Sequence, residues 1–415
     1  MIKLMNTSFI FLLLVIFSCK LETDNKDVQT NAKVTQVIKN PAIGNSMQPF
    51  LFKDGKDILM SWTQKINDSS YTLNYSTLSD KKWSKAKEIA QSKDWFVNWA
   101  DFPTIAKNEN DLIAHFLQKS DKATFAYDIQ IKQSSENGLT WSEAKKLHQD
   151  KTLTEHGFVT ILPYKEDGFF MTWLDGRNTG VEAHDDAHES EAAMTIRAAI
   201  VKANGEIMDD TLIDVKTCDC CQTSAAITQN GPIIVYRDRT DEEIRDIYIA
   251  RLIDKKWTKP KAIFNDNWKI NGCPVNGPKA AALNSTLAVA WFTAAENIPK
   301  VNLVFSNDNG ASFNAPIHID NGRAIGRVDV ALIDEQNALV SWMETTEFAA
   351  EIKVMKVHSD GTKSAALVVS PISAARGSGF PQMELINDEI VFAWNNVIDK
   401  LTTIKTLSFS IDVLQ

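Results

Sequence analysis

The sequence contains no run of basic residues, and this absence sets the first limit on function. Its 44 Lys and Arg residues are scattered along the chain and are outnumbered by 53 Asp and Glu residues, which gives a net charge of -9. Nucleic acids and anionic lipid surfaces attract proteins through clustered positive charge. We therefore expect no nucleic-acid partner and no membrane binding through bulk electrostatics.

A long apolar stretch is also missing at the start of the chain. The apolar residues 9–17 follow Lys3 and end at Ser18 and Cys19, which is the layout of a secretory signal. The stretch falls below the ~20 residues that a membrane-spanning helix needs. A cysteine directly after such a stretch resembles the lipobox of bacterial lipoproteins, although Phe17 is bulkier than the usual residue there.

That resemblance implies a signal peptide over residues 1–18 and a lipid on Cys19. An ordinary signal peptide cut nearby, or an uncleaved anchor, is the alternative. Residues 19–32 are charged and poor in apolar residues, so they are expected to form a flexible tether. We expect a monomer in the cell envelope that touches the membrane only through its lipid anchor, with a folded domain over residues 33–415.

An internal repeat organises that domain. Each unit contains two short apolar strands joined by a turn, and the second strand ends in an aromatic residue. Successive aromatic residues are 54, 57, 63, 55, 51 and 52 positions apart, which suits a four-stranded blade with its turns. These residues are Trp62, Phe116, Trp173, Tyr236, Trp291, Trp342 and Trp394.

The repeat predicts an all-β fold, a β-propeller of seven four-stranded blades. Six blades remain the alternative if one unit is an insertion, and the even spacing disfavours two β-sandwich domains. After Trp394 the chain holds roughly three strands' worth of sequence, at ~5–6 residues per mean strand. We expect residues 33–39 to supply the missing outer strand and so to close the ring.

Two turns resemble the Asp-box of sialidases and their relatives, whose pattern is Ser-x-Asp-x-Gly-x-x-Trp. They are residues 134–141 (SSENGLTW) and 306–313 (SNDNGASF). In such a turn the acidic side chain accepts backbone N–H groups and glycine supplies a positive φ. The resemblance implies a sialidase-like propeller over nearly the whole mature chain.

Side chains that could act in catalysis or ligand binding concentrate in loops on one face of such a propeller. This is the face where each first strand begins and each second strand ends. The sharpest cluster is Cys218, Cys220 and Cys221, with Cys273 at the start of the next unit. With His156, these thiolates would suit Cu(I) or Zn. Disulfides that cross to Cys273 are the competing interpretation for an exported protein, and free thiols are the third.

A second cluster lies in the longest unit, where residues 184–189 read HDDAHE. Its two histidines are four residues apart, a spacing that a metal site on a helical turn would use. A solvated acidic loop is the alternative, and the length of the unit suggests a lid over the mouth.

Arginine is absent before Arg177. Sialidases grip a substrate carboxylate with three arginines, because a guanidinium fork matches a carboxylate. Arg237, Arg327 and Arg376 could converge in this way, with Arg177 nearby, or they could form ion pairs that brace the blades. The Phe-Arg-Ile-Pro segment of sialidases is missing, and Tyr236 is the one tyrosine at a promising strand end.

Three functions follow from these patterns. The first is a propeller that binds a glycan or small-molecule ligand at its mouth, through a centre that contains copper or zinc. The second is a glycoside hydrolase of the sialidase kind acting on acidic glycans, with Asp101, Asp175 or Glu344 as acid/base and Tyr236 as the candidate nucleophile. The third is a binding scaffold without chemistry, because fold does not dictate function.

Overall fold

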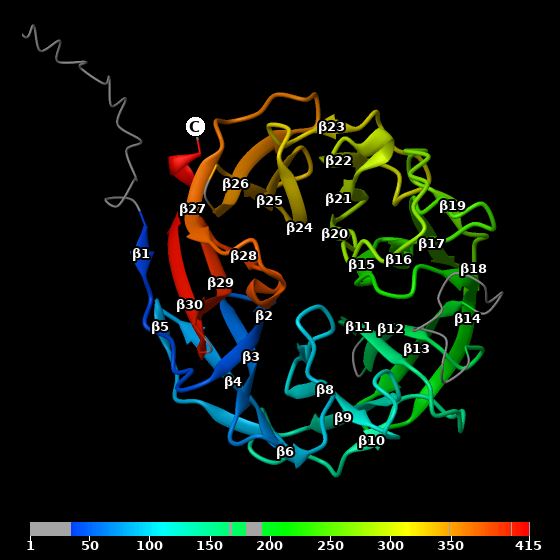
Figure 1. Cartoon of the computed structure of the whole chain (residues 1–415), viewed down its shortest axis with the longest axis vertical. Helices are drawn as coiled ribbons and strands as arrows, with labels where there is room; N and C mark the ends of the chain where they lie inside the picture. Colours follow the sequence, from blue (N-terminus) through cyan, green and yellow to red (C-terminus); the bar gives the residue numbers. More distant parts are fainter. Residues whose placement is uncertain (1–34, 166–167, 180–192, 348, 400, 415) are drawn as a thin grey trace, which may run out of the picture. The chain divides into compact units, whose positions relative to one another are not determined.

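The computed structural model describes residues 35–165, 168–179, 193–347, 349–399 and 401–414. The chain divides into a unit over Met1–Lys33 and a compact unit over Val34–Gln415. The predicted signal peptide, Cys19 and the tether lie outside the described residues. The compact unit is all-β and forms seven sheets arranged in a ring (Figure 1). The predicted seven-bladed β-propeller is confirmed.

Each blade is an antiparallel sheet, and in six of the seven the strands follow one another in the sequence. The first strands, which contact one another around the axis, are β2 (Ser46–Asp54), β7 (Ile105–Asn108), β11 (His156–Tyr164), β15 (Ser224–Thr228), β20 (Lys279–Leu283), β24 (Ala324–Leu332) and β28 (Gln382–Ile386). The second strands are β3 (Asp57–Lys65), β8 (Asp111–Lys119), β12 (Gly168–Asp175), β16 (Gly231–Arg237), β21 (Thr286–Thr293), β25 (Asn337–Thr345) and β29 (Glu389–Ile398).

The outer half of each blade is less regular. The third strands are β4 (Ser70–Ser79), β9 (Tyr127–Ser134), β13 (Met194–Lys202), β17 (Ile247–Ile253), β22 (Lys300–Ser306), β26 (Ala350–His358) and β30 (Leu401–Ser410). The outermost strands are β5 (Lys82–Trp83) with β6 (Lys87–Lys93), β10 (Lys145–Lys146), β14 (Ile207–Thr217), β18 (Lys256–Trp257) with β19 (Lys261–Ala262), β23 (Ile317–His318), β27 (Leu367–Ile372) and β1 (Gln36–Val37).

Helical structure among the described residues is limited to three short 3-10 turns, and no helix there has the length and apolar character to cross a membrane. These turns are η1 (Ala295–Asn297), η2 (Arg376–Ser378) and η3 (Ile411–Val413).

The ring closes through the N-terminal strand. β1 pairs with β30, with Gln36 opposite Ser408 and Val37 opposite Leu407, so the last blade takes its outer strand from the start of the domain. Ile38, which follows β1, is buried against this blade and its neighbour. The predicted closure is therefore confirmed.

The repeating aromatic residues explain why the sheets stack. All seven are buried on the second strands, and Trp291, Trp342 and Trp394, for example, share core clusters with residues of the preceding blade. A large aromatic side chain removes more apolar surface from water than any aliphatic one, so one per blade provides much of the driving force for radial packing.

The two Asp-box-like turns have the same local geometry. Both join a third strand to a fourth, and Gly138 and Gly310 adopt φ values of 74° and 76°. Their amides donate to Ser134 Oγ and Ser306 Oγ, each at 2.9 Å. These turns lie on the face opposite to the loops that precede the first strands, as the alternating strand direction requires.

Candidate functional site

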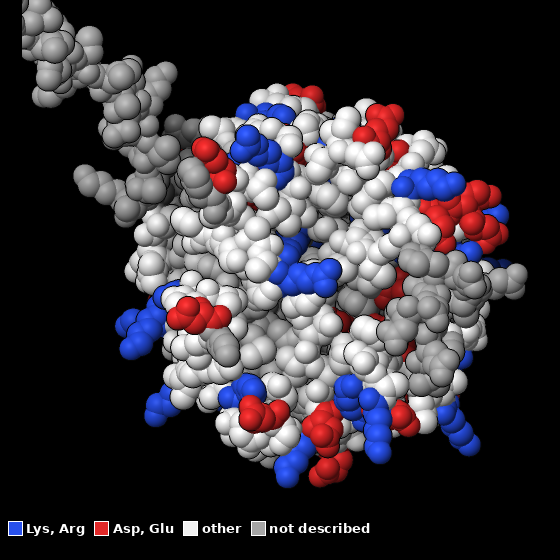
Figure 2. Space-filling view, in the orientation of Figure 1, with Lys and Arg blue, Asp and Glu red and all other residues white. Residues whose placement is uncertain are grey.

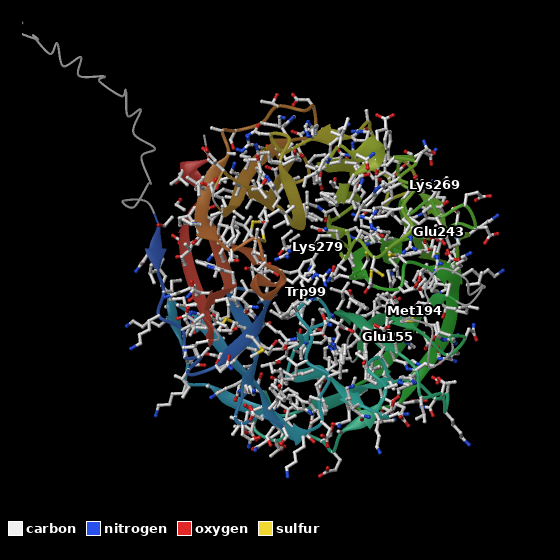
Figure 3. The ribbon with its side chains drawn as sticks, viewed as in Figure 1. Trp99, Glu155, Met194, Glu243, Lys269 and Lys279 are labelled. Atoms are coloured by element: carbon white, nitrogen blue, oxygen red, sulfur yellow. The ribbon has the colours of Figure 1, made fainter. Side chains whose placement is uncertain are left out.

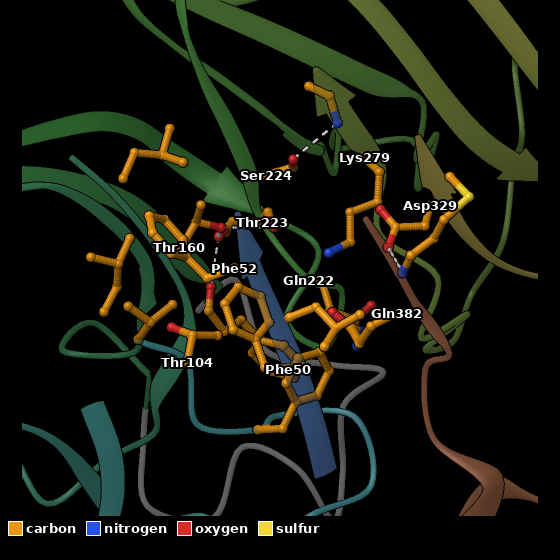
Figure 4. A pocket seen from close by; sticks show the side chains of 18 of the residues that line it. Phe50, Phe52, Thr104, Thr160, Gln222, Thr223, Ser224, Lys279, Asp329 and Gln382 are labelled. Atoms are coloured by element: carbon orange, nitrogen blue, oxygen red, sulfur yellow. Dashed lines mark hydrogen bonds between the residues drawn. The ribbon is translucent and has the colours of Figure 1, made fainter. Parts of the chain in front are cut away.

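The loops that precede the first strands are joined into a closed circle, which we call the mouth girdle. In each link a polar side chain of one blade bonds to the next blade, and together the links connect all seven blades. The links are Asn395–Gln48, Gln48–Asn98, Asp101–Phe158, Thr160–Thr223, Gln222–Gly277, Asn276–Arg327 and Asp329–Met383. Two of them are drawn in Figure 4.

Backbone distortions of the first strands serve three of these links. Gln48, Phe158 and Arg327 have φ values of 59°, 54° and 52°, each at a register shift in its strand. A non-glycine residue with positive φ is uncommon, and bulges re-aim the groups beside them. Here each bulge turns a backbone N–H toward the side-chain oxygen of a neighbouring blade.

A cavity of about 230 Å³ lies inside the ring, where the first strands approach one another (Figure 4). Its wall is apolar on the side of Phe50 and Phe52 and charged on the side of Lys279, Asp329 and Glu384. Burial raises the pKa of Glu384 to about 8, and the nearby Asp329 carboxylate adds to the effect. The wall of the cavity can therefore present a neutral Glu384 carboxyl group near neutral pH.

Positive side chains gather near the centre of the mouth face (Figure 2). Trp99 and Lys279 lie close to the ring centre, whereas Glu155 and Met194 lie over the third blade (Figure 3). The Arg327 guanidinium stacks 5.0 Å from the Trp99 ring, and Arg376 lies 5.9 Å from the same ring. Burial, together with the smaller effect of the Arg376 charge, lowers the pKa of Arg327 to about 10.

The two arginines therefore share one aromatic platform at the mouth. Among the described residues, neither has a carboxylate within ion-pair distance, and Arg327 donates instead to the backbone oxygen of Gly379 at 2.9 Å. An acidic group of a ligand would meet two uncompensated guanidinium groups there.

Arg237 does not join this pair, which corrects the predicted three-arginine clamp. Its guanidinium is buried and donates to the backbone oxygens of Asn276, Arg245 and Phe292. The Arg237 guanidinium group also lies 4.8 Å from the ring of Trp268. Its hydrogen bonds are therefore directed at the protein's own carbonyl groups. Arg237 is a structural residue that fixes the loops of the fourth and fifth blades.

The thiols of Cys218, Cys220 and Cys221 form a compact cluster in the turn between β14 and β15. Cys218 Sγ lies 3.9 Å from Cys220 Sγ and 3.5 Å from Cys221 Sγ. Cys273, from the loop of the next blade, reaches Cys220 by a hydrogen bond that lowers the pKa of Cys273. All four are free thiols, so the cluster predicted from the sequence is brought together as unbonded sulfur atoms.

Positive charge surrounds this cluster. Burial opposes ionisation of Cys218, but hydrogen bonds from Cys220 and Cys221 and the charges of Arg245 and Arg237 outweigh it, so the Cys218 pKa falls well below its usual range. Arg245 Nη1 donates to Cys218 Sγ at 3.3 Å. Cys218 is therefore the sulfur that exists as a thiolate, which is the form that binds metals.

The turn that carries the sulfurs is held firmly. Asp219 accepts from the Met194 amide at 2.9 Å and from Arg239 Nη1 at 3.1 Å. Gln222, which follows Cys221, donates to Ala100 O and accepts from the Gly277 amide. The cysteine cluster is thus part of the mouth and is tied to the loops of three other blades.

His156 is not a ligand of this cluster, which corrects the sequence-based assignment. Its imidazole stacks on His148 with ring centroids 3.7 Å apart, and its Nε2 lies 3.2 Å from Asp150 and 3.7 Å from Asp175. His156 begins β11, whereas the sulfurs precede β15 in the following blade. The histidine and the cysteines belong to separate donor sets.

A third feature of the mouth is a tyrosine held between two carboxyl groups. Tyr127 Oη lies 2.6 Å from Glu155 Oε1 and 3.1 Å from Asp101 Oδ2. Asp101 Oδ1 also accepts the Phe158 amide at 2.8 Å, and Asp101 lines the cavity. Burial raises the pKa of Asp101 to about 8, and the charge of Glu155 contributes to the increase.

One phenol proton cannot satisfy two carboxylates at once. A protonated Asp101 resolves this, because it donates to Tyr127 Oη while Tyr127 donates to Glu155. The structure thus places a neutral acid and an ionisable carboxyl group on one hydrogen-bonded chain. Two carboxyl groups in different protonation states are what general acid and base chemistry requires.

The remaining predicted acid/base and ligand residues have structural partners. Asp175 pairs with Arg177, whose Nε lies 2.7 Å from Asp175 Oδ1, and it also accepts Trp173 Nε1 at 2.9 Å. Glu344 accepts the Trp342 indole at 2.8 Å in the same way. These contacts brace the second strands. The catalytic role of Asp175 and Glu344 and the ligand-binding role of Arg177 stay predictions.

Tyr236 is also structural. Its ring is buried and its hydroxyl donates to Asp214 on β14, the outermost strand of the preceding blade. It therefore points toward the periphery and not into the mouth. The predicted cluster at residues 184–189 lies outside the described residues.

Several residues of the mouth escaped the sequence analysis. Tyr127 lies at the start of a third strand, and Arg245 and His148 lie in irregular segments that no motif marks. The sequence feature that could have marked them is a pair of polar or ionisable residues where an apolar strand begins, as in Tyr127-Asp128 and Glu155-His156.

Comparisons with known proteins give no family. No family model and no curated protein matches the chain. Similar solved structures include a protein of unknown function from Dyadobacter fermentans, with 11% identity and a TM-score of 0.49 over 75% of this chain and 94% of that one. An α-L-arabinofuranosidase from Fusarium graminearum has 13% identity and a TM-score of 0.48 over 92% and 98% of the two chains.

A NanB sialidase from Streptococcus pneumoniae has 11% identity and a TM-score of 0.46 over 88% of this chain and 86% of that one. Similarity at this level transfers neither an activity nor a set of site residues. The function has to be argued from the side chains of the mouth.

The raised pKa of Asp101 predicts a specific pH dependence of stability. The folded state holds a proton on Asp101 that the unfolded state releases above pH ~4. Stability should therefore fall as pH rises from about 4 to about 8. Asp101→Asn removes this loss and can still accept from Phe158 and donate to Tyr127.

Urea unfolding of both proteins at pH 5.5 and 8.5, values chosen as roughly inside and above that window, should show that the stability of the variant relative to wild type is greater at the higher pH. Exposed Glu109→Gln is the control and should change nothing at either pH. An equal difference between Asp101→Asn and wild type at the two pH values would contradict the protonation assigned to Asp101.

Proposed function

We propose that this β-propeller binds a soft or borderline metal ion, Cu(I) or Zn(II), through Cys218, Cys220 and Cys221 at its mouth. Cys273 completes the donor set from the next blade. The metal centre and the Arg327–Arg376 pair together receive a small-molecule or glycan ligand. The observation that carries the proposal is the spacing of the three sulfur atoms.

That spacing matches what a metal requires. Zinc–sulfur bonds of about 2.3 Å in a tetrahedron place the sulfurs about 3.8 Å apart. The separations of Cys218 Sγ from Cys221 Sγ and Cys220 Sγ, 3.5 and 3.9 Å, bracket this value. A disulfide needs sulfur atoms at about 2.05 Å, so the present arrangement is closer to a metal site than to a bridge.

The electrostatic surroundings also favour bound thiolates. A centre of three or four thiolates with one metal ion carries net negative charge, which burial alone would penalise. Arg245 contacts Cys218 directly, and Arg239 pairs with the adjacent Asp219. These fixed charges offset the penalty before any metal binds, which is the function of a preorganised site.

We propose that the protein carries out this role outside the cytoplasm, anchored to the cell envelope by a lipid on Cys19. What supports this is the short apolar stretch that ends at the cysteine. Cys19→Ala should move the protein from the membrane fraction to the soluble fraction, and unchanged membrane association would refute the anchor.

Metal analysis of the full chain, purified without oxygen, tests the thiolate centre. We expect about one equivalent of sulfur-bound copper or zinc, with Cys221→Ser weakening the affinity of this centre by at least about 100-fold, the upper end of what losing an outer-shell partner costs. His148→Gln is the matched control and should leave the sulfur-bound metal in place. Metal-free protein with its four thiols paired as two disulfides would overturn the proposal.

A second function has its own supporting observation. Asp101, Tyr127 and Glu155 form one hydrogen-bonded chain, and its two carboxyl oxygens are no more than about 5.7 Å apart, the sum of the two bond lengths. Retaining glycosidases place their two carboxyl groups about 5–5.5 Å apart. With Arg327 and Arg376 as carboxylate partners, this arrangement suits hydrolysis of an acidic glycan.

Chromogenic glycosides of sialic and uronic acids test this second function. If it is correct, one of them is hydrolysed, and Tyr127→Phe and Glu155→Gln each lower kcat by about 100-fold or more. Tyr236→Phe is the control, because its hydroxyl faces the periphery. Absence of hydrolysis across the panel, with the metal centre intact, would leave ligand binding as the function.

A further inference from the structure

A second group of potential metal ligands lies between the second and third blades. Asp128 is on β9, His148 follows β10, and His156 begins β11. One ligand atom of each residue lies within 4.8 Å of the other two. All three side chains are buried, with relative exposures of 7%, 1% and 0%.

The facing atoms of this group make no hydrogen bond of regular geometry. They are Asp128 Oδ1, His148 Nε2 and His156 Nε2, each shielded from solvent. The nearest approaches are 3.4 Å between His148 Nε2 and Asp128 Oδ1 and 3.2 Å between His156 Nε2 and Asp150 Oδ2. Buried polar atoms are normally satisfied, because an unpaired one costs free energy comparable to a lost hydrogen bond. Three unsatisfied atoms that face one another call for a shared partner.

The far sides of the two imidazoles are already occupied. His148 Nδ1 lies 2.7 Å from Asp150 Oδ2, and His156 Nδ1 lies 3.1 Å from the backbone oxygen of Thr154. Both acceptors require a proton on Nδ1, so in the neutral rings each Nε2 carries a lone pair. A carboxylate or carbonyl behind a histidine is the usual outer partner of a metal ligand, since it fixes the tautomer.

The separations also fit a cation. Bonds of about 2.0–2.1 Å from zinc to nitrogen or oxygen in a tetrahedron place the ligand atoms about 3.3 Å apart. His148 Nε2 lies 3.4 Å from Asp128 Oδ1. The second oxygen of Asp128 is held by Lys146 at 2.7 Å, which leaves Oδ1 directed at the histidines.

Protons are the competing occupants. Protonating His148 would satisfy Asp128, but His156 would then need a second proton to face Asp150, and two imidazolium rings would stack 3.7 Å apart. Like charges at that separation in a buried site repel. One cation shared by both rings satisfies all three facing atoms at once.

We propose that Asp128, His148 and His156 form a second metal site, which takes a divalent cation of the zinc class. Two imidazoles and a carboxylate select such borderline cations over Cu(I), which prefers sulfur. Because the rings are within 7° of parallel, one must rotate for both Nε2 atoms to reach the same ion. Asp150, which holds His148, is the positioning residue.

This site is independent of the sulfur-bound metal in its ligands and in its preferred ion. It would exist even if the cysteines formed disulfides. A failure of the first proposal therefore leaves this one standing, and the two are separable by experiment.

Cobalt titration of the full chain separates the two sites. A sulfur-bound Co(II) gives an intense near-ultraviolet charge-transfer band, whereas nitrogen and oxygen ligands give only visible d–d bands. We expect both features in the wild type and loss of the second component alone in His148→Gln. Asp150→Asn should weaken zinc binding at this site by about 10- to 100-fold.

His318→Gln is the matched control, because His318 also pairs with an aspartate, Asp320, at 2.9 Å but lies elsewhere in the fold. The chain in which all four cysteines are replaced by serine should still bind about one zinc and melt at a higher temperature when zinc is present. If the wild type and His148→Gln bind the same number of zinc ions, with the same cobalt spectrum, the group is a protonated ion-pair network and the proposal is wrong.

Discussion

The mouth girdle is the constraint on which the rest of the structure depends. Radial packing of seven sheets through apolar surfaces sets the distance between blades but does not fix how far each blade slides along the axis. Directional bonds such as Asn276 to the Arg327 amide do fix it, because a hydrogen bond weakens steeply when its angle changes. The positions of all the side chains at the mouth follow from this alignment.

The same bonds explain why so many polar residues at the mouth are buried without being functional. Asp329 and Asn395 are buried polar residues, and each accepts a backbone N–H of an adjacent blade. Asp101 differs from them. It makes a bond of this kind to Phe158 and uses its second oxygen for Tyr127, so one carboxyl group both braces the ring and belongs to a candidate site.

The sequence predicts the fold well because the fold depends on periodic features. Each buried aromatic residue at the end of a second strand, such as Trp173, sits in an apolar segment of standard length, and the Gly138 and Gly310 turns repeat one local geometry. The cysteine cluster was also predictable, because three of its members are neighbours in the chain.

The other contacts were not predictable, because they depend on side-chain direction across blades. Arg237 and Arg327 both lie where a second or first strand meets the mouth, but Arg237 turns inward to carbonyl groups while a bulge directs Arg327 onto Trp99. His156 looked like a partner of the cysteines, yet its ring stacks on His148, which is eight positions earlier and carries no motif.

The pairing of β1 with β30 also restricts when this protein can become native. The final blade needs strands from both ends of the folded unit, so the circle stays open until β30 has left the ribosome. Until then the first blade exposes the apolar face that the seventh will cover, which favours binding by chaperones. Vectorial folding can complete six blades, but the last step must wait for β30.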